Sequence, residues 1–245
     1  MKTAFRLTFA ALAVPLALAA CSSEQGTAEA EAEALAAIPA PEGTQWSQVA
    51  QDTEMGGVLV GNPDAPLKLV EYASHTCPHC ADFSEQSHDK IEEYINKGVL
   101  SLELRNQVHN VIDITFATIA FCGEPGVYQP LARQGWADLQ GLVGPAQANQ
   151  DAVNAAMTVT DDTRFQRIGE ALGLVDWFAA RGISRDQAMQ CLSGSETPMA
   201  IAERSEKQSD ELGVTGTPTF FLNGNKLEEQ SWADLEPVLQ RAGAR

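Results

Sequence analysis

His75-Thr76-Cys77-Pro78-His79-Cys80 is the stretch around which the chain is organised: two cysteines separated by two residues, where an apolar run gives way to an amphipathic one. A Cys-x-x-Cys pair at a junction between a strand and a helix is typical of a dithiol/disulfide redox centre. The same pair alone supplies only half of the ligands of a structural zinc site. The rest of the chain has to decide between these two interpretations.

The residues before the motif predict a central strand of a sheet. In the run 66–73 apolar residues occupy both faces of the predicted strand, as expected for a strand covered on both sides. Glu71 is the exception, because it places a carboxylate on an apolar face six residues before Cys77. A carboxylate in that position requires a functional or structural reason.

The residues after the motif predict a helix and then a second strand. From Cys77 onward apolar residues recur at helical spacing, Pro78 suits the first helical position, and Gly98 is placed to end the helix. In 100–104 leucines alternate with polar residues, which indicates a strand. Such a strand–helix–strand unit favours parallel pairing of its two strands.

The region from Asp113 to Gly213 predicts a helical insertion, since its helical patterns are punctuated by Gly and Pro and it has few β-branched runs. Within it, Ser184 and Gln187 form a capping-box pattern, and Thr197-Pro198 opens a helix that runs to about Leu212. The insertion separates the strand–helix–strand unit from the remaining strands.

The sheet is expected to resume at 217–222, followed by Asn223-Gly224, the favoured pair for a two-residue hairpin turn, and by a short return strand that ends at Leu227. A closing helix follows. Pro237 predicts that this helix begins near Asp234 rather than Ser231, because proline is tolerated in a first turn and disruptive later.

The N-terminus predicts export. Lys2 and Arg6 precede the apolar run from Leu7 to Ala20, fourteen residues, which is too short to span a bilayer and is typical of a secretory signal over residues 1–20. The sequence 18–21, Leu-Ala-Ala-Cys, resembles a bacterial lipobox, which predicts acylation of Cys21. The alternative is ordinary cleavage near 17–20, which leaves Cys21 as an odd thiol in an oxidising compartment.

Because Ser22, and not Asp, follows the cysteine, an outer-membrane anchor in the cell envelope is the expectation. Residues 21–45 are rich in Ala and Glu with few large apolar side chains, which predicts a flexible tether. The folded domain is then expected at 46–245, interrupted by the insertion at about 113–213. The net charge of −17 over 245 residues argues against nucleic acid as a partner.

In this order of elements the chain resembles the thioredoxin fold, and specifically the DsbA type of thiol:disulfide oxidoreductase, from about Gly57 to Arg241. The Cys-Pro-His-Cys motif at 77–80 matches that family's active site, Glu71 matches its buried acid, and Gly216-Thr217-Pro218 matches its cis-proline loop. The fold class implied is α/β, a thioredoxin fold with a helical insertion between its βαβ half and its C-terminal ββα half.

The roles expected of the motif follow from its place at a helix N-terminus. Cys77 meets unpaired N–H groups and the positive end of the helix dipole, and His79 can add charge or a hydrogen bond, so the pKa of Cys77 should lie below that of a free thiol. Cys80, one turn into the helix, is the resolving thiol, and Pro78 completes the motif. The resemblance implies that Glu71 lies beneath Cys80 and relays its proton.

The cis-proline loop is expected to bind substrate. A cis Pro218 would turn the Thr217 backbone toward Cys77, where its N–H and C=O can pair with an extended chain. Cys122 and Cys191 remain, and in an exported protein they favour a structural disulfide over a second redox centre or a metal site. The segments around both cysteines also resemble helical segments of the DsbA-type family.

The other histidines carry weaker expectations. His75 is close enough in sequence to tune Cys77, His88 lies on the polar side of the predicted helix, and His109 adds no recognisable ligand set. Too few ligands converge in the sequence for a metal site, and no cofactor is expected.

Three functions follow from these observations. The first is an envelope oxidase, monomeric and recycled by a membrane redox partner, that donates the Cys77–Cys80 disulfide to exported proteins. The second is a reductase or isomerase, because Thr217 before the proline also occurs in reducing relatives. The third is a lipid-anchored binding module in which the cysteines are merely structural.

Overall fold

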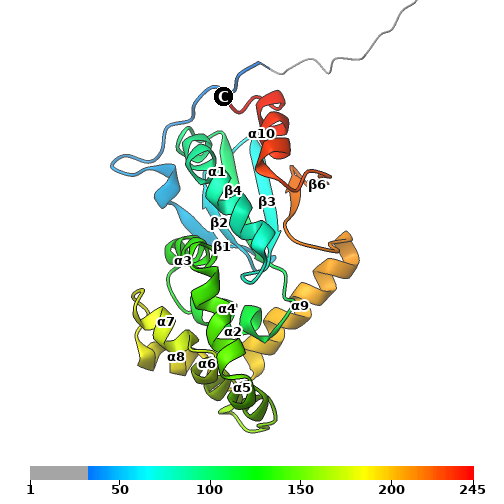
Figure 1. Ribbon diagram of the computed structural model, residues 1–245. Coiled ribbons are helices and arrows are strands. Elements are labelled where there is room, and N and C mark those ends of the chain that lie inside the picture. The colour runs from blue at the N-terminus through cyan, green and yellow to red at the C-terminus, as the bar shows by residue number, and fades with distance from the viewer. Residues whose placement is uncertain (1–32) are drawn as a thin grey trace, which may run out of the picture. The chain divides into compact units, whose positions relative to one another are not determined.

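The computed structural model describes residues 33–245, so the predicted signal peptide and Cys21 lie outside the described residues. Within 33–245 the strands form one six-stranded sheet in the order β1-β2-β4-β3-β5-β6 (Figure 1). The strands are β1 (Ala50–Asp52), β2 (Val58–Gly61), β3 (Leu67–Ala73), β4 (Leu100–Asn106), β5 (Thr219–Leu222) and β6 (Asn225–Lys226). Only β3 and β4 pair in parallel, and the other neighbours are antiparallel. The predicted thioredoxin-type α/β fold is confirmed.

The strand–helix–strand unit at the centre has the predicted form. β3 lies between β4 and β5, and α1 (Pro78–Asn96) follows it with Cys77 as its N-cap residue. The buried side chains of α1 recur at helical spacing and pack on the sheet, as its sequence predicts. Gly98 then reverses the chain at φ +73°, where a Cβ would lie only 2.4 Å from the carbonyl oxygen of Ile38.

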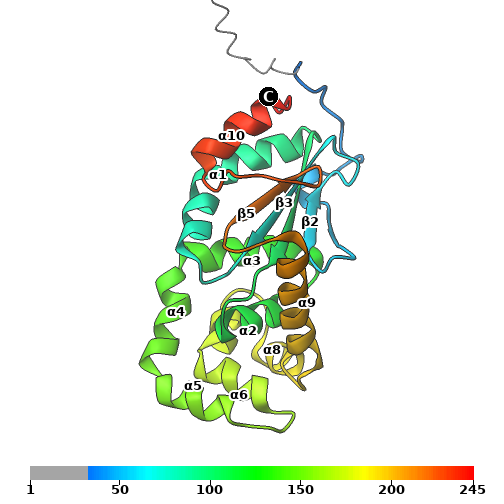
Figure 2. The same cartoon turned by 90° about the vertical axis from the view of Figure 1, so that its right-hand side faces the viewer.

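The helical insertion begins two residues earlier than predicted. The Asn110 side chain accepts hydrogen bonds from the backbone N–H groups of Ile112 and Asp113, so helix α2 begins at Val111. The helices of the insertion are α2 (Val111–Ala120), α3 (Pro125–Ala137), α4 (Leu139–Ala148), α5 (Gln150–Met157), α6 (Arg164–Ala171), α7 (Leu174–Ala179), α8 (Arg185–Cys191) and α9 (Glu196–Leu212). Figures 1 and 2 show most of these helices gathered beyond one end of the sheet, with α9 leading back to β5.

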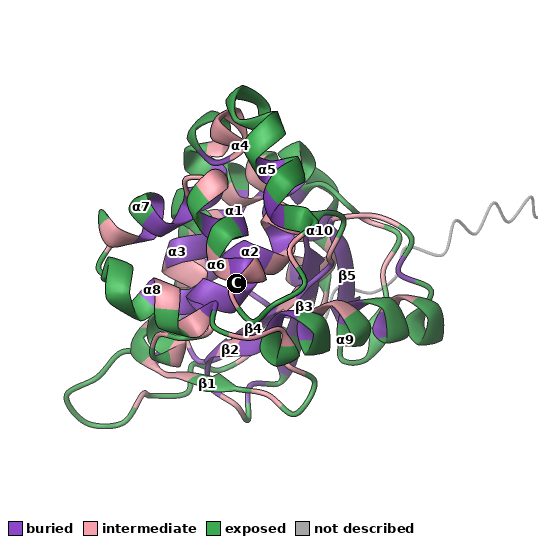
Figure 3. Cartoon of the chain, turned by 90° about the horizontal axis from the view of Figure 1, so that it is seen from below, coloured by how far each residue is buried: buried purple, intermediate pink, exposed green. Residues whose placement is uncertain are grey.

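Two large apolar clusters and a small third one, of Tyr72, Val214 and Phe221, form the core of the described domain. One large cluster joins the sheet to α1 and to the last helix, with Leu69, Tyr94 and Leu100 fully buried. The other large cluster lies inside the insertion around Phe116 and Phe178 and extends to Cys80. Figure 3 shows the strands β3, β4 and β5 buried, whereas α9 turns a largely exposed face outward. The start of α1 is therefore the place where the two cores meet.

The C-terminal elements differ from the prediction at one boundary. The turn at Asn223-Gly224 has the expected positive φ values of 50° and 82°. Helix α10 (Trp232–Arg241), however, begins after Ser231 and not near Asp234, because the Ser231 hydroxyl accepts the Asp234 N–H and caps the helix. Pro237 is accommodated in the second turn, where it costs the helix one backbone hydrogen bond.

The described part of the predicted tether contacts the domain. Backbone N–H groups of Leu35 and Ile38 donate to the carbonyl oxygens of Gly243 and Lys97, at 2.9 and 2.8 Å. The Trp46 indole N–H donates to the Ile38 carbonyl oxygen at 2.7 Å. The boundary expected at residue 45 is therefore too late, because these bonds attach the chain from Leu35 onward. Within residues 33–245 no helix has the length and apolar character needed to cross a membrane.

Candidate active site

The two cysteines of the motif lie at the N-terminus of α1 with unequal exposure. Cys77 is partly exposed and Cys80 is fully buried, and both thiols are free in the structure. Pro78 is the first residue of the helix and is exposed, so it presents the motif to solvent without blocking Cys77. The accessible sulfur is therefore that of Cys77, and Cys80 lies one turn behind it.

The environment separates the acidities of the two thiols. The hydrogen bond from Cys80 lowers the pKa of Cys77 to about 5, although partial burial opposes this effect. The backbone N–H groups of His79 and Cys80 at the helix N-terminus add to the lowering. Burial raises the pKa of Cys80, as do its hydrogen bond to Cys77 and the charge of Glu71. At neutral pH the site thus holds a thiolate on Cys77 and a protonated Cys80.

His79 acts on Cys77 through its backbone N–H, while its imidazole is exposed beside the motif. His75 is placed elsewhere than expected: its ring stacks on Phe116 at 4.1 Å and its Nε2 lies 3.0 Å from Oδ1 of Asn106. Burial lowers the pKa of His75, so the ring is neutral and belongs to the core of the insertion. His88 lies at the surface of α1 beside Arg133.

Glu71 lies buried on β3, where its side chain is 3% exposed. Burial and the negative charge of Cys77 raise the pKa of Glu71 to about 8. Its Oε1 has no hydrogen-bond partner in the described part of the chain, and the side chain lines a cavity of about 60 Å³ together with Ser87 and His88. Glu71 acts on Cys80 electrostatically, because its charge raises the pKa of that thiol.

The loop before β5 faces the nucleophile. The Thr217–Pro218 peptide bond is cis, and Sγ of Cys77 lies 3.3 Å from the carbonyl oxygen of Thr217. A groove of about 450 Å³ runs beside this loop, and we name it the cis-proline groove. Its lining includes Thr217, Pro218, His79, Phe83 and Trp232, with three carboxylates, the groove carboxylates, from Asp82, Glu228 and Asp234. The groove is therefore both next to Cys77 and negatively charged.

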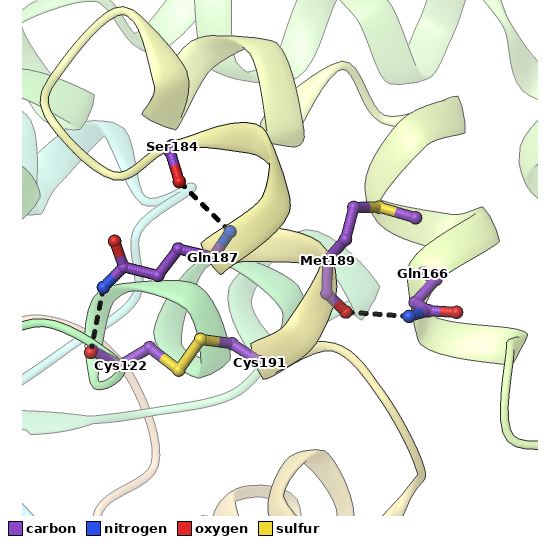
Figure 4. The surroundings of a disulfide bond; sticks show 6 residues. All are labelled: Cys122, Gln166, Ser184, Gln187, Met189 and Cys191. Carbon is purple, nitrogen blue, oxygen red and sulfur yellow. Dashed lines mark hydrogen bonds between the residues drawn. A yellow bond between two sulfur atoms is a disulfide. The ribbon is translucent and has the colours of Figure 1, made fainter.

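The remaining cysteines form a disulfide between Cys122 and Cys191, with Cα atoms 6.1 Å apart. Figure 4 shows this bond, which links Cys122, two residues beyond the end of α2, to Cys191, the last residue of α8. Gln187 approaches the Cys122 carbonyl oxygen from α8, and its own backbone N–H is capped by the Ser184 hydroxyl. This bond covalently links two helices of the insertion.

No three His, Cys, Asp or Glu side chains converge as a metal site anywhere in 33–245. The Cys77–Cys80 pair thus lacks the further ligands that a zinc site would need in that part of the chain. One residue that the sequence did not single out does reach the motif: the buried carboxylate of Asp113, at the start of α2, binds the loop just before Cys77. Local sequence patterns contain no signal for such a contact, because it depends on how the insertion packs.

A helix that begins at a Cys-x-x-Cys motif on the central strand, opposite a cis-proline loop, defines a thioredoxin-fold protein with a dithiol centre. The chain belongs to the thioredoxin family, since the family model described as "Thioredoxin" matches residues 53–241. A crystal structure of protein-disulfide isomerase from Novosphingobium aromaticivorans is similar at 30% identity and a TM-score of 0.70, covering 76% of this chain and 97% of that one. Alpha-DsbA1 of Wolbachia pipientis shares the fold at 21% identity and a TM-score of 0.59, covering 82% of this chain and 98% of that one.

A protein of Rickettsia typhi, provisionally named a protein-disulfide oxidoreductase, is 23% identical over 186 residues, which are 76% of this chain. The match covers 61% of the Rickettsia protein, so this chain spans less than two thirds of the length of that curated relative. Two of these relatives carry names of protein-disulfide enzymes, one as an isomerase and one as an oxidoreductase.

Proposed function

We propose that this chain is a thiol:disulfide oxidoreductase that acts as a DsbA-like oxidase and donates a Cys77–Cys80 disulfide to exported proteins. The observation that carries the proposal is the separation in acidity, with the pKa of Cys77 lowered to about 5 and that of Cys80 raised. A stable Cys77 thiolate favours the reduced enzyme, which makes the corresponding disulfide a good oxidant.

The reaction follows from this separation. A substrate thiolate attacks Sγ of Cys77, a new sulfur–sulfur bond forms, and the Cys77–Cys80 bond breaks. The electron pair leaves with Cys80, whose sulfur takes the proton of Glu71. A second substrate thiolate attacks the substrate sulfur of this mixed disulfide, and Cys77 leaves as its thiolate. The substrate dithiol is oxidised and the enzyme reduced; of the two substrate protons, one restores Glu71 and the other goes to solvent.

The cis-proline groove is the proposed binding site for the substrate chain. The Thr217 backbone lies beside the Cys77 sulfur, where it can pair with an extended main chain. Main-chain pairing is tolerant of sequence, so a broad range of exported proteins is expected. The groove carboxylates add a preference for basic residues near the reacting cysteine.

The proposed location is the periplasmic side of the cell envelope, with a lipid anchor on Cys21 in the outer membrane. The secretory pattern of residues 1–20 supports export, and the Cys122–Cys191 bond suits an oxidising compartment. A membrane redox partner would then reoxidise the enzyme. Mass spectrometry of the mature N-terminus in membrane fractions tests the anchor, and a soluble chain with an unmodified Cys21 would contradict it.

The decisive experiment is equilibration of the protein with glutathione. We expect a potential near that of DsbA, about −120 mV, whereas a value near that of thioredoxin, about −270 mV, would contradict an oxidase. Trapping adds a second test: Cys80→Ala should accumulate mixed disulfides through Cys77. The double variant Cys122→Ala, Cys191→Ala retains the motif and serves as its control, because it should accumulate none.

Isomerisation is a second candidate, motivated by the similarity to the Novosphingobium protein-disulfide isomerase, which is 30% identical. Reactivation of a scrambled disulfide protein distinguishes it from oxidation, since an oxidase acts on reduced substrate and an isomerase on mispaired substrate. A non-catalytic binding module is the third candidate. In that case Cys77→Ala would leave the biological activity intact, and Cys80→Ala would trap no adduct.

A further inference from the structure

The loop Ser74–Thr76 connects the end of β3 to Cys77 and so determines where the nucleophile lies. It forms a tight turn, because the Cys77 N–H donates to the Ser74 carbonyl oxygen at 3.2 Å. Cys77 then occupies the N-cap position of α1, beside the backbone N–H groups of His79 and Cys80 that help to lower its pKa. A change in this loop would move Cys77 relative to those groups.

The loop is held by the carboxylate of Asp113, which comes from the first helix of the insertion and is 1% exposed. The Ser74 hydroxyl donates to both carboxylate oxygens at 3.0 Å. The Thr76 backbone N–H and hydroxyl donate to Oδ1 at 3.1 and 3.2 Å. The His109 N–H donates to Oδ2 at 2.9 Å. Three of these four donors belong to the loop that precedes Cys77.

These hydrogen bonds satisfy the buried carboxylate. The ring of His75 also interacts electrostatically with Asp113, but burial lowers the pKa of His75, so it is neutral. A buried carboxylate is costly unless its hydrogen bonds are made, so each donor is held firmly in place. The Trp136 indole N–H adds a second attachment from α3, to the Ser74 carbonyl oxygen at 3.0 Å.

We propose that Asp113 is a positioning residue for the nucleophile: its carboxylate ties the Ser74–Thr76 loop to the helical insertion and thereby holds Cys77 against the N-terminus of α1. The insertion is then part of the redox centre as well as a cover for the sheet. This inference rests on the proposed function, because it concerns how the reacting sulfur is held.

The sign of one measurement separates positioning from a purely electrostatic role. If the negative charge of Asp113 acted only through space, its removal would favour the thiolate and lower the pKa of Cys77. If Asp113 acts by position, its removal frees the loop, the sulfur loses part of its contact with the helix N–H groups, and the pKa of Cys77 rises. The two roles predict opposite shifts.

The test is a pH titration of the Cys77 thiolate by its ultraviolet absorbance in the reduced, full domain of Asp113→Asn. We expect the midpoint to rise by about one pH unit, a tenfold change in the ionisation constant. Asp138→Asn is the control, because Asp138 also lies in the insertion but accepts its hydrogen bonds from Trp177 and Arg181 and not from the Ser74–Thr76 loop. Its midpoint should stay at the wild-type value.

A midpoint that falls, or that does not move in folded Asp113→Asn, would overturn the proposal. If that variant fails to fold, Asp113→Glu decides: it keeps the charge and displaces the oxygens, so positioning predicts a raised midpoint and a through-space effect predicts none. The titration needs no substrate. The titration can therefore contradict the role of Asp113 while the glutathione equilibrium still supports an oxidase. Equally, it can support the role of Asp113 while the glutathione equilibrium contradicts an oxidase.

Discussion

The redox potential of the Cys77–Cys80 pair should depend on pH only half as steeply as that of an ordinary dithiol. Between about pH 6 and 7.5 the pH is above the pKa of Cys77, which is about 5, so Cys77 stays a thiolate in the reduced enzyme. Reduction then takes up one proton, on Cys80, whose pKa is raised. One proton per two electrons changes the equilibrium constant tenfold per pH unit, which corresponds to about 30 mV.

The same numbers fix where the slope changes. Below about pH 5 Cys77 also takes up a proton on reduction, and the slope doubles to about 59 mV per pH unit. If Cys77 had the ordinary thiol pKa of 9.0, the steeper slope would persist up to pH 9.0. The plots of potential against pH for the native and for this hypothetical Cys77 diverge from pH 5 upward. At pH 7 the native disulfide is therefore a stronger oxidant than the hypothetical one by up to about 60 mV. Solvent screening at the partly exposed Cys77 reduces this value.

The assay is equilibration with glutathione or dithiothreitol redox buffers from pH 4 to 7.5, followed by alkylation of the free thiols and mass measurement. The slope above the break is read between pH 6 and 7, because Glu71, with a pKa of about 8 in the reduced form, begins to lose its proton toward pH 7.5. A slope that breaks near pH 5 supports the reasoning. A constant slope near 59 mV over the whole range would refute it, because Cys77 would then be protonated throughout.

Three further predictions concern stability and substrate choice. Because the folded pKa of Glu71 is raised to about 8 from 4.5, the destabilising effect of this residue is absent near pH 4 and grows as the pH rises. Glu71→Gln should therefore raise the free energy of unfolding at pH 8.5 by about 3 to 5 kcal/mol. If the urea midpoints of the variant and the wild type coincide at both pH values, this prediction is wrong. Replacing Cys122 and Cys191 by Ser should cost about 4 kcal/mol in urea unfolding for a separation of 69 residues, and a loss below about 1 kcal/mol would count against the loop-entropy argument. A cysteine peptide with a neighbouring Lys should react about threefold to tenfold faster than its Glu counterpart, because of the groove carboxylates, and the preference should shrink with added salt.

Local patterns predicted the elements whose signals lie within a few residues. The change of period at Cys77, from a strand to a helix, predicted β3 and α1, and the Asn223-Gly224 pair predicted the last hairpin. The edge strand β1 and its neighbour β2 were not predicted. β1 is only three residues long and two of them are exposed. β2 pairs with β1 and with β4, and β4 lies far along the chain.

The candidate site divides in the same way. The spacing of Cys77 and Cys80 indicated the redox chemistry, while Glu71 and Pro218 were assigned through the resemblance to a family. Asp113 escaped both routes, since 37 residues separate it from Thr76 and their contact forms only when the insertion packs on the motif.

By itself, then, the sequence determined which atoms can react and which helix presents them, because a Cys-x-x-Cys motif at a helix N-terminus is a local arrangement of neighbouring residues. Only the tertiary structure decided how acidic each sulfur is. Burial of Cys80, the unpartnered Glu71 and the carboxylate that holds the Cys77 loop all arise from contacts between distant segments. Desolvation and hydrogen bonding, which shift a pKa, are properties of those contacts and not of the order of residues.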